Sequence, residues 1–199
     1  MRTARATIAA PLTAAAAAVL TTAWFALAAA GGLAASAVFP AARGLDLSMP
    51  EYAGFLSAEP ELGRMMVAGH LAERVFELTG TLRVPVAALA ALAVAAFIVV
   101  RGWRLATVLA AIALLTASGA MAASVWWLQP DFQRQDARYR EAARAGDAER
   151  ARAEKPAVDA SHASASRAAG TEALALLVLA GLVAATAPAH GVRQEPTGA

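Results

Sequence analysis

The chain has 199 residues, of which 59% are hydrophobic and only 16% are charged, and its formal net charge is +2. Soluble domains usually carry about 25% charged residues, so this composition excludes an ordinary water-soluble globule. Arginines spread along the chain without interleaved aromatic residues exclude a nucleic-acid interface, and the absence of cysteine excludes disulfides, thiolate catalysis and cysteine-ligated metals.

Four segments are apolar enough to cross a bilayer, which requires about 20 residues of helix. They are residues 9–40, 82–100, 105–128 and 169–187. Trp103 and the pair Trp126–Trp127 flank the third segment, as is typical of aromatic residues at the two membrane–water interfaces. We therefore predict an all-α integral membrane protein, in which residues 1–199 form a single four-transmembrane-helix bundle.

The first apolar segment resembles a signal peptide in two respects. Arg2 and Arg5 precede it, and the Ala-Ser-Ala sequence at 35–37 is similar to a cleavage site. Its apolar stretch is, however, about twice as long as the roughly 7–15 residues of a signal-peptide core. We therefore predict that it is a retained transmembrane helix.

The connection between the first two apolar segments contains an amphipathic helix at about 61–80. A polar arc of about 100° on this helix consists of His70, Glu73, Arg74 and Glu77. The adjoining apolar arc consists of Val67, Leu71, Val75 and Leu78. We predict that the helix lies in the membrane interface and leads through Gly80 and Pro85 into the second segment. The preceding residues 48–62 are predicted to form short surface turns.

The connection 129–168 is rich in Arg, Glu and Ala, with opposite charges three and four residues apart, which favours helix. We predict a solvated charged helix or helical hairpin after Pro130, broken near Gly146 and stopped by Pro156. A flexible polar stretch should then lead into the fourth segment. This connection is also the candidate surface for a membrane-protein partner, although it lacks the sustained apolar heptads of a coiled coil.

Arginine placement predicts the orientation of the bundle. The N-terminus and the short Arg101–Arg104 loop carry arginines and should be cytoplasmic, whereas the longer connections 39–83 and 129–168 should lie outside. We therefore expect a multi-pass protein of a bacterial-type inner membrane, with the lipid bilayer around it and both termini in the cytoplasm.

The polar cluster on the 61–80 helix has two interpretations. His70 and Glu73 lie one helical turn apart, a spacing that could hold a metal ion or orient an imidazole for proton transfer. They could equally belong to a water-exposed helix face on which they form salt bridges with Arg74 and Glu77. If the fourth segment folds against this face, His162 and Glu172 could join His70 and Glu73 in a two-histidine, two-glutamate site.

The apolar segments contain no ionisable residue away from their ends. Ionisable residues within a membrane usually mark proton relays and ion pathways, so a proton-coupled pump or an ion-selective pore is not expected. No nucleotide-binding, serine-hydrolase or zinc-protease motif is present. We therefore assign no catalytic residue and no cofactor, and any metal would be bound by His70 and His162.

Four stretches together resemble the transmembrane protein 205-like family, a domain of unknown function numbered 4149. They are "ASAVFPAARGL", "VAGHLAERVFEL", "WWLQPDFQRQDARYREA" and "DASHASASRAAGTEAL". They are similar, in order, to the end of that family's first helix, the lead into its second, the Leu-x-Pro turn after its third and the His-x-x-Ser entry to its fourth. The resemblance covers residues 20–187 and implies a four-helix membrane protein without an established reaction.

Three functions are compatible with these observations. The leading one is a small integral membrane protein that acts as a structural or interaction component, and whether it is also an enzyme stays open. The alternative is a membrane-embedded metal-binding protein or enzyme that uses the interfacial His/Glu cluster. A third is a transporter of a neutral or lipid-like solute, since an uncharged bundle would pass little else.

Overall fold

A computed structural model of the chain describes residues 2–45 and 49–186, and every element in these ranges is helical. In chain order the elements are α1 (Arg2–Gly44), the 3-10 turn η1 (Pro50–Tyr52), α2 (Ala53–Ala58), α3 (Pro60–Arg101), α4 (Leu105–Ala123), the π-helical turn η2 (Ser124–Leu128), α5 (Gln129–Arg144) and α6 (Ala148–Ala185). Since α4, η2 and α5 are continuous, four long helices result, and each is long and apolar enough to cross a membrane. The predicted all-α class with four apolar helices is confirmed at this level.

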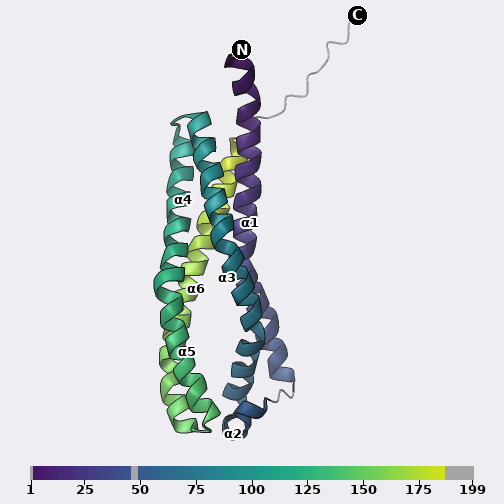
Figure 1. The fold of residues 1–199 in the computed structure, drawn as a ribbon, viewed down its shortest axis with the longest axis vertical. Coiled ribbons are helices and arrows are strands. Elements are labelled where there is room, and N and C mark those ends of the chain that lie inside the picture. The colour runs from purple at the N-terminus through teal and green to yellow at the C-terminus, as the bar shows by residue number, and fades with distance from the viewer. Residues whose placement is uncertain (1, 46–48, 187–199) are drawn as a thin grey trace, which may run out of the picture.

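The four long helices run up and down in an elongated bundle (Figure 1). Two tight turns connect them where a glycine adopts positive φ, Gly102 (φ 73°) before α4 and Gly146 (φ 71°) before α6. The break near Gly146 is where the sequence predicts it. At about 1.5 Å per residue, the 42 residues of α3 extend about 63 Å, roughly twice the hydrocarbon thickness of a bilayer. About half of α3 therefore lies outside any membrane that its apolar half crosses.

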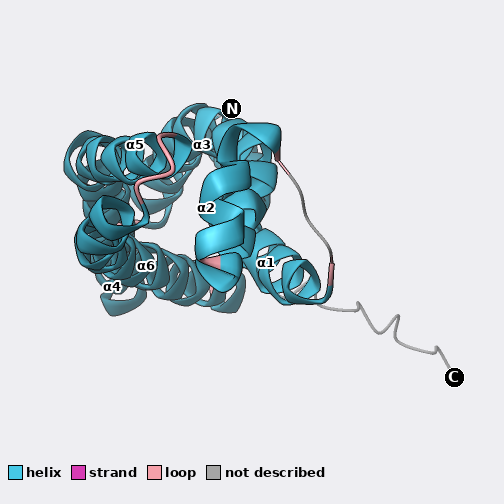
Figure 2. Ribbon diagram, turned by 90° about the horizontal axis from the view of Figure 1, so that it is seen from below, coloured by secondary structure: helices cyan, strands magenta, loops and turns pink. Residues whose placement is uncertain are grey.

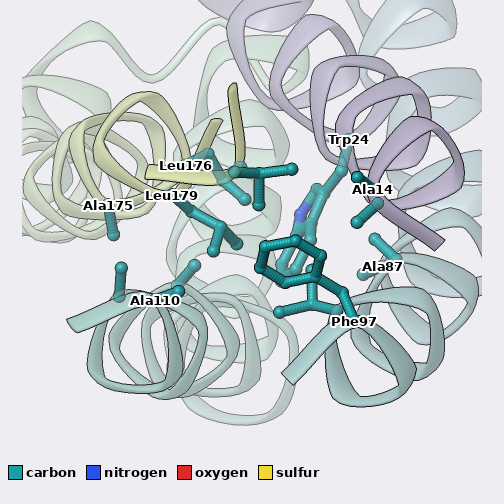
Figure 3. Packing of buried hydrophobic residues seen from close by; sticks show 14 residues of the cluster. Ala14, Trp24, Ala87, Phe97, Ala110, Ala175, Leu176 and Leu179 are labelled. Carbon is teal, nitrogen blue, oxygen red and sulfur yellow. The ribbon is translucent and has the colours of Figure 1, made fainter. Parts of the chain in front are cut away.

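The apolar half of the bundle has its own core, to which α1, α3, α4 and α6 all contribute. Its larger buried side chains are Trp24, Val94, Phe97, Leu176, Leu179 and Val183. Alanines fill the remaining helix contacts, and such small side chains allow helix backbones to approach closely. Figure 3 shows Trp24 projecting from α1 into this cluster, in which Phe97 and Leu176 are also buried.

The opposite end of the bundle has a second core, and α2 lies at this end, in front of α1 and α3 in Figure 2. Tyr52 and Phe55 are buried there against α5, and the rings of Phe55 and Tyr139 meet edge to face with centroids 6.1 Å apart. The prediction of simple surface turns over 48–62 is therefore wrong for its described part. Pro50 and Pro60 begin helical elements, and the aromatic residues between them are anchors of a packed core.

The separate interfacial helix predicted at 61–80 is also not observed, because α3 continues without interruption from Pro60 to Arg101. Gly80 and Pro85 are interior residues of this helix. A proline inside a helix removes one hydrogen bond and costs about 3 kcal/mol, so local propensity favours a break. Packing of α3 along α1 overrides that preference.

The predicted stop at Pro156 and the flexible stretch after it are likewise wrong, since α6 is helical from Ala148 to Ala185. Ala151 and Val158 are buried against α5 on either side of Pro156, and this packing holds the helix through it. Pro130 is accommodated differently. The wide turn η2 directly precedes α5 and relieves the clash between the proline ring and the carbonyl group four residues earlier.

Candidate functional site

The polar cluster of the sequence prediction lies between α3 and α5 in the half of the bundle away from the apolar core. Arg140 of α5 donates a hydrogen bond from Nη1 to Glu73 Oε2 at 3.0 Å, and the same nitrogen lies 3.3 Å from His70 Nδ1. Its Nε atom forms an ion pair with Asp136 at 2.7 Å. His70 and Glu73 also contact each other at 3.3 Å. One arginine thus ties together residues from two helices.

This geometry places a permanent cation where a metal ion bound by His70 and Glu73 would have to sit. Burial raises the pKa of the Asp136 carboxyl above its usual range, while the Arg140 guanidinium beside it opposes that rise. A guanidinium that satisfies a carboxylate on each side is an inter-helix clamp. We call His70, Glu73, Asp136 and Arg140 the α3–α5 clamp.

The remaining candidates of the sequence prediction do not join this clamp. Glu77 pairs with Arg74 at 2.8 Å on the exposed side of α3. His162 is exposed on α6, where its ring lies 6.2 Å from that of Phe132. Within the described ranges, no group of three or more histidine, aspartate or glutamate side chains is arranged to hold a metal ion.

Glu172 occupies a different site, inside the apolar half of the bundle. Its side chain is 0% exposed, and its Oε1 atom accepts a 2.8 Å hydrogen bond from Nε1 of Trp24. Its other oxygen, Oε2, lies 3.6 Å from Nη1 of Arg83 on α3. Glu172 on α6 is therefore connected to both α1 and α3, and we call these three residues the core triad.

The polar groups of the core triad are not fully paired. In the described part of the chain, Glu172 Oε2 and Arg83 Nε are buried without a hydrogen-bond partner, as is the hydroxyl of Thr21, one turn from Trp24 on α1. Each unpaired buried group typically costs about 1–3 kcal/mol. The core triad thus connects three helices at an energetic cost, which one long ion pair only partly offsets.

Sequence reasoning selected Glu172 but missed both Trp24 and Arg83 as its partners. A usable signal was present. Arg83 is the second residue of the apolar segment 82–100 and Glu172 is the fourth of 169–187, and both segments enter the apolar layer from the same side in an up-and-down bundle. Opposite charges at a similar depth in the apolar layer predict an ion pair. No comparable signal identified Trp24, which reaches Glu172 only because α1 packs against α6.

Comparisons with known proteins add no further assignment: no family model, no curated protein and no solved structure matches the chain. The structure itself defines the class, a four-helix bundle whose long helices suggest a multi-pass membrane protein.

Proposed function

We propose that this protein is a multi-pass protein of a bacterial-type inner membrane that acts as an interaction component, with both termini in the cytoplasm. The apolar halves of the four long helices cross the lipid bilayer. The other halves form a rigid extramembrane bundle on the outer side, and its α5–α6 hairpin, residues 129–168, offers a charged surface to a membrane-protein partner.

The observation that carries this proposal is the second core at the far end of the bundle. A protein that only crossed a membrane would need neither the buried pair Tyr52 and Phe55 nor helices about twice as long as the bilayer is thick. This core holds the hairpin rigidly, while charged residues such as Arg138, Glu141 and Arg150 remain exposed on its outer side. Rigid presentation of an exposed charged surface favours recognition of another protein.

The polar groups inside the bundle support the same function rather than catalysis. The α3–α5 clamp and the core triad each join side chains from different helices, and their charged groups are engaged with one another. The centre of the apolar half is occupied by the apolar cluster around Leu176 and Leu179. No observation specifically favours the metal-binding alternative or the transporter alternative. The resemblance to the transmembrane protein 205-like family fits the proposed four-span architecture.

In-cell photo-crosslinking tests the proposal. A photoreactive residue replaces Arg138 or Arg150 on the hairpin and, as the matched control, exposed Leu33 on α1. We expect both hairpin positions to trap the same membrane protein and Leu33 not to trap it. The variant R138E/R150E should lose this adduct while remaining folded. Absence of a common adduct from the two hairpin positions would contradict an interaction surface there.

A further inference from the structure

One exposed face of α3 carries an uninterrupted apolar stripe along most of the helix. Its members are Leu71, Val75, Leu78, Leu82, Pro85, Leu89, Leu92, Ala96 and Val99, all of them exposed. We call this stripe the α3 seam. At about 1.5 Å per residue it extends about 42 Å, and the side chains of Leu78 and Val99 are 62% and 81% exposed. No other helix of the described chain covers it.

The spacing of the α3 seam is that of a coiled coil. Its members alternate at intervals of four and three residues, and Leu71, Leu78, Pro85, Leu92 and Val99 follow one another at intervals of seven. An apolar repeat of 3.5 residues sustained over about four heptads is typical of a helix that packs along a second helix with a left-handed crossing.

Lipid does not account for the lower end of the α3 seam. Arg74 and Glu77 lie between its residues there and form an exposed ion pair, so this part of α3 faces water. Leu71 is nevertheless 59% exposed. The seam thus continues from the candidate span into the half of the bundle that carries exposed charges, and an exposed apolar stripe of this length beside charged residues favours contact with another protein surface.

We propose that the α3 seam is the interface of a parallel homodimer, in which α3 of one copy packs along α3 of a second copy. Two copies inserted in one membrane in the same direction place these helices parallel to each other. Among the heptad e and g positions that directly border the seam, Arg74 is the only charged residue, and in a parallel pair it faces the neutral Thr79 of the other copy, which avoids repulsion. A self-complementary stripe suits a two-fold interface. This inference rests on the membrane insertion proposed above but not on the hairpin partner.

Single-cysteine cross-linking tests the dimer, because the chain contains no cysteine of its own. The variants L71C, V75C and L78C are oxidised with copper phenanthroline in isolated membranes. The matched control is E77C, which is also exposed and adjacent to Leu78 but points away from the seam. We expect a cross-linked species of twice the chain mass from the three seam variants and several-fold less from E77C.

A second measurement keeps the test independent of cysteine reactivity. The mass of the protein in nanodiscs should correspond to two chains for the wild type and for E77Q, and to one chain for L71E/L78E. Equal cross-linking of L78C and E77C, a one-chain mass for the wild type, or a seam adduct with a different protein would each overturn the proposal. Recovery of the protein outside the membrane fraction would instead contradict the proposed membrane function.

Discussion

Glu172 is the residue whose burial is hardest to account for by stability alone. Its carboxylate is fully enclosed, its only hydrogen bond from the described residues comes from Trp24, and its charge partner Arg83 approaches to 3.6 Å without a hydrogen bond. Buried ion pairs often add little net stability but become strongly destabilising when one partner is lost. The two charges should therefore be energetically coupled.

A double-mutant cycle tests this coupling. E172L leaves Arg83 unpaired in an apolar core and should destabilise the protein by about 3–5 kcal/mol. The double variant R83L/E172L should recover most of that loss, because neither charge remains buried. The measurement is the free energy of unfolding in detergent by denaturant titration.

The matched control is E77L, since Glu77 also forms an ion pair with an arginine of α3 but is exposed. Exposed pairs contribute about 0–1 kcal/mol, so E77L should have little effect. If R83L/E172L were no more stable than E172L, the two residues would not act as a pair.

The α3–α5 clamp shows what the sequence could and could not predict at the scale of single residues. The i, i+3 spacing of His70 and Glu73 predicts that they share a face, and they do. Arg140, which contacts both His70 and Glu73, lies 67 residues from Glu73 along the chain. Helical periodicity carries no information on such long-range pairing. For the same reason the sequence could not exclude a shared site with His162.

At the scale of the elements, the connection of α2 to α3 depends on one glycine. A Cβ atom at Gly63 would lie 2.6 Å from Cδ2 and 3.1 Å from Cα of Leu56. The second of these contacts is with backbone, which cannot move without displacing α2. Gly69 lies on the same helix six residues later, and a Cβ atom there would meet nothing within 4 Å.

The pair of variants G63A and G69A separates packing from helix propensity. G63A should destabilise the far end of the bundle, by about 1–3 kcal/mol for an overpacked contact. G69A should stabilise α3 by about 0.5–1 kcal/mol, because alanine loses less conformational entropy in a helix. Thermal unfolding of both variants measures the difference, and a shift of the same sign in both would contradict close α2–α3 packing.

The continuity of the helices was the least predictable property of the elements. Gly80, Pro85 and Pro156 are helix-breaking residues, so reasoning from local propensity divides α3 and α6 at these points. In the structure both helices continue, because each packs along a neighbour over most of its length. By contrast, Gly102 and Gly146 sit at true turns, where positive φ makes glycine favourable. Only tertiary contacts distinguish the two groups.

At the scale of the whole molecule, the bundle has two halves with separate cores and different surfaces. The apolar half matches a bilayer, and the other half has a separate aromatic core and the charged hairpin. Composition and hydropathy predict the four apolar segments well, because the bilayer selects strongly for length and apolarity. They do not predict that the connections form one packed extension of the bundle, since that depends on Tyr52, Phe55 and Tyr139 meeting across the fold.

Membrane topology is the measurement that tests the central claim most directly. In the otherwise cysteine-free chain, A145C marks the α5–α6 turn and R104C marks the α3–α4 turn at the opposite end of the bundle. A membrane-impermeant maleimide applied to intact spheroplasts should label A145C and should label R104C only after permeabilisation. Labelling of both positions from outside, or of neither, would contradict a bundle that crosses the membrane with its charged half exposed on the outer side.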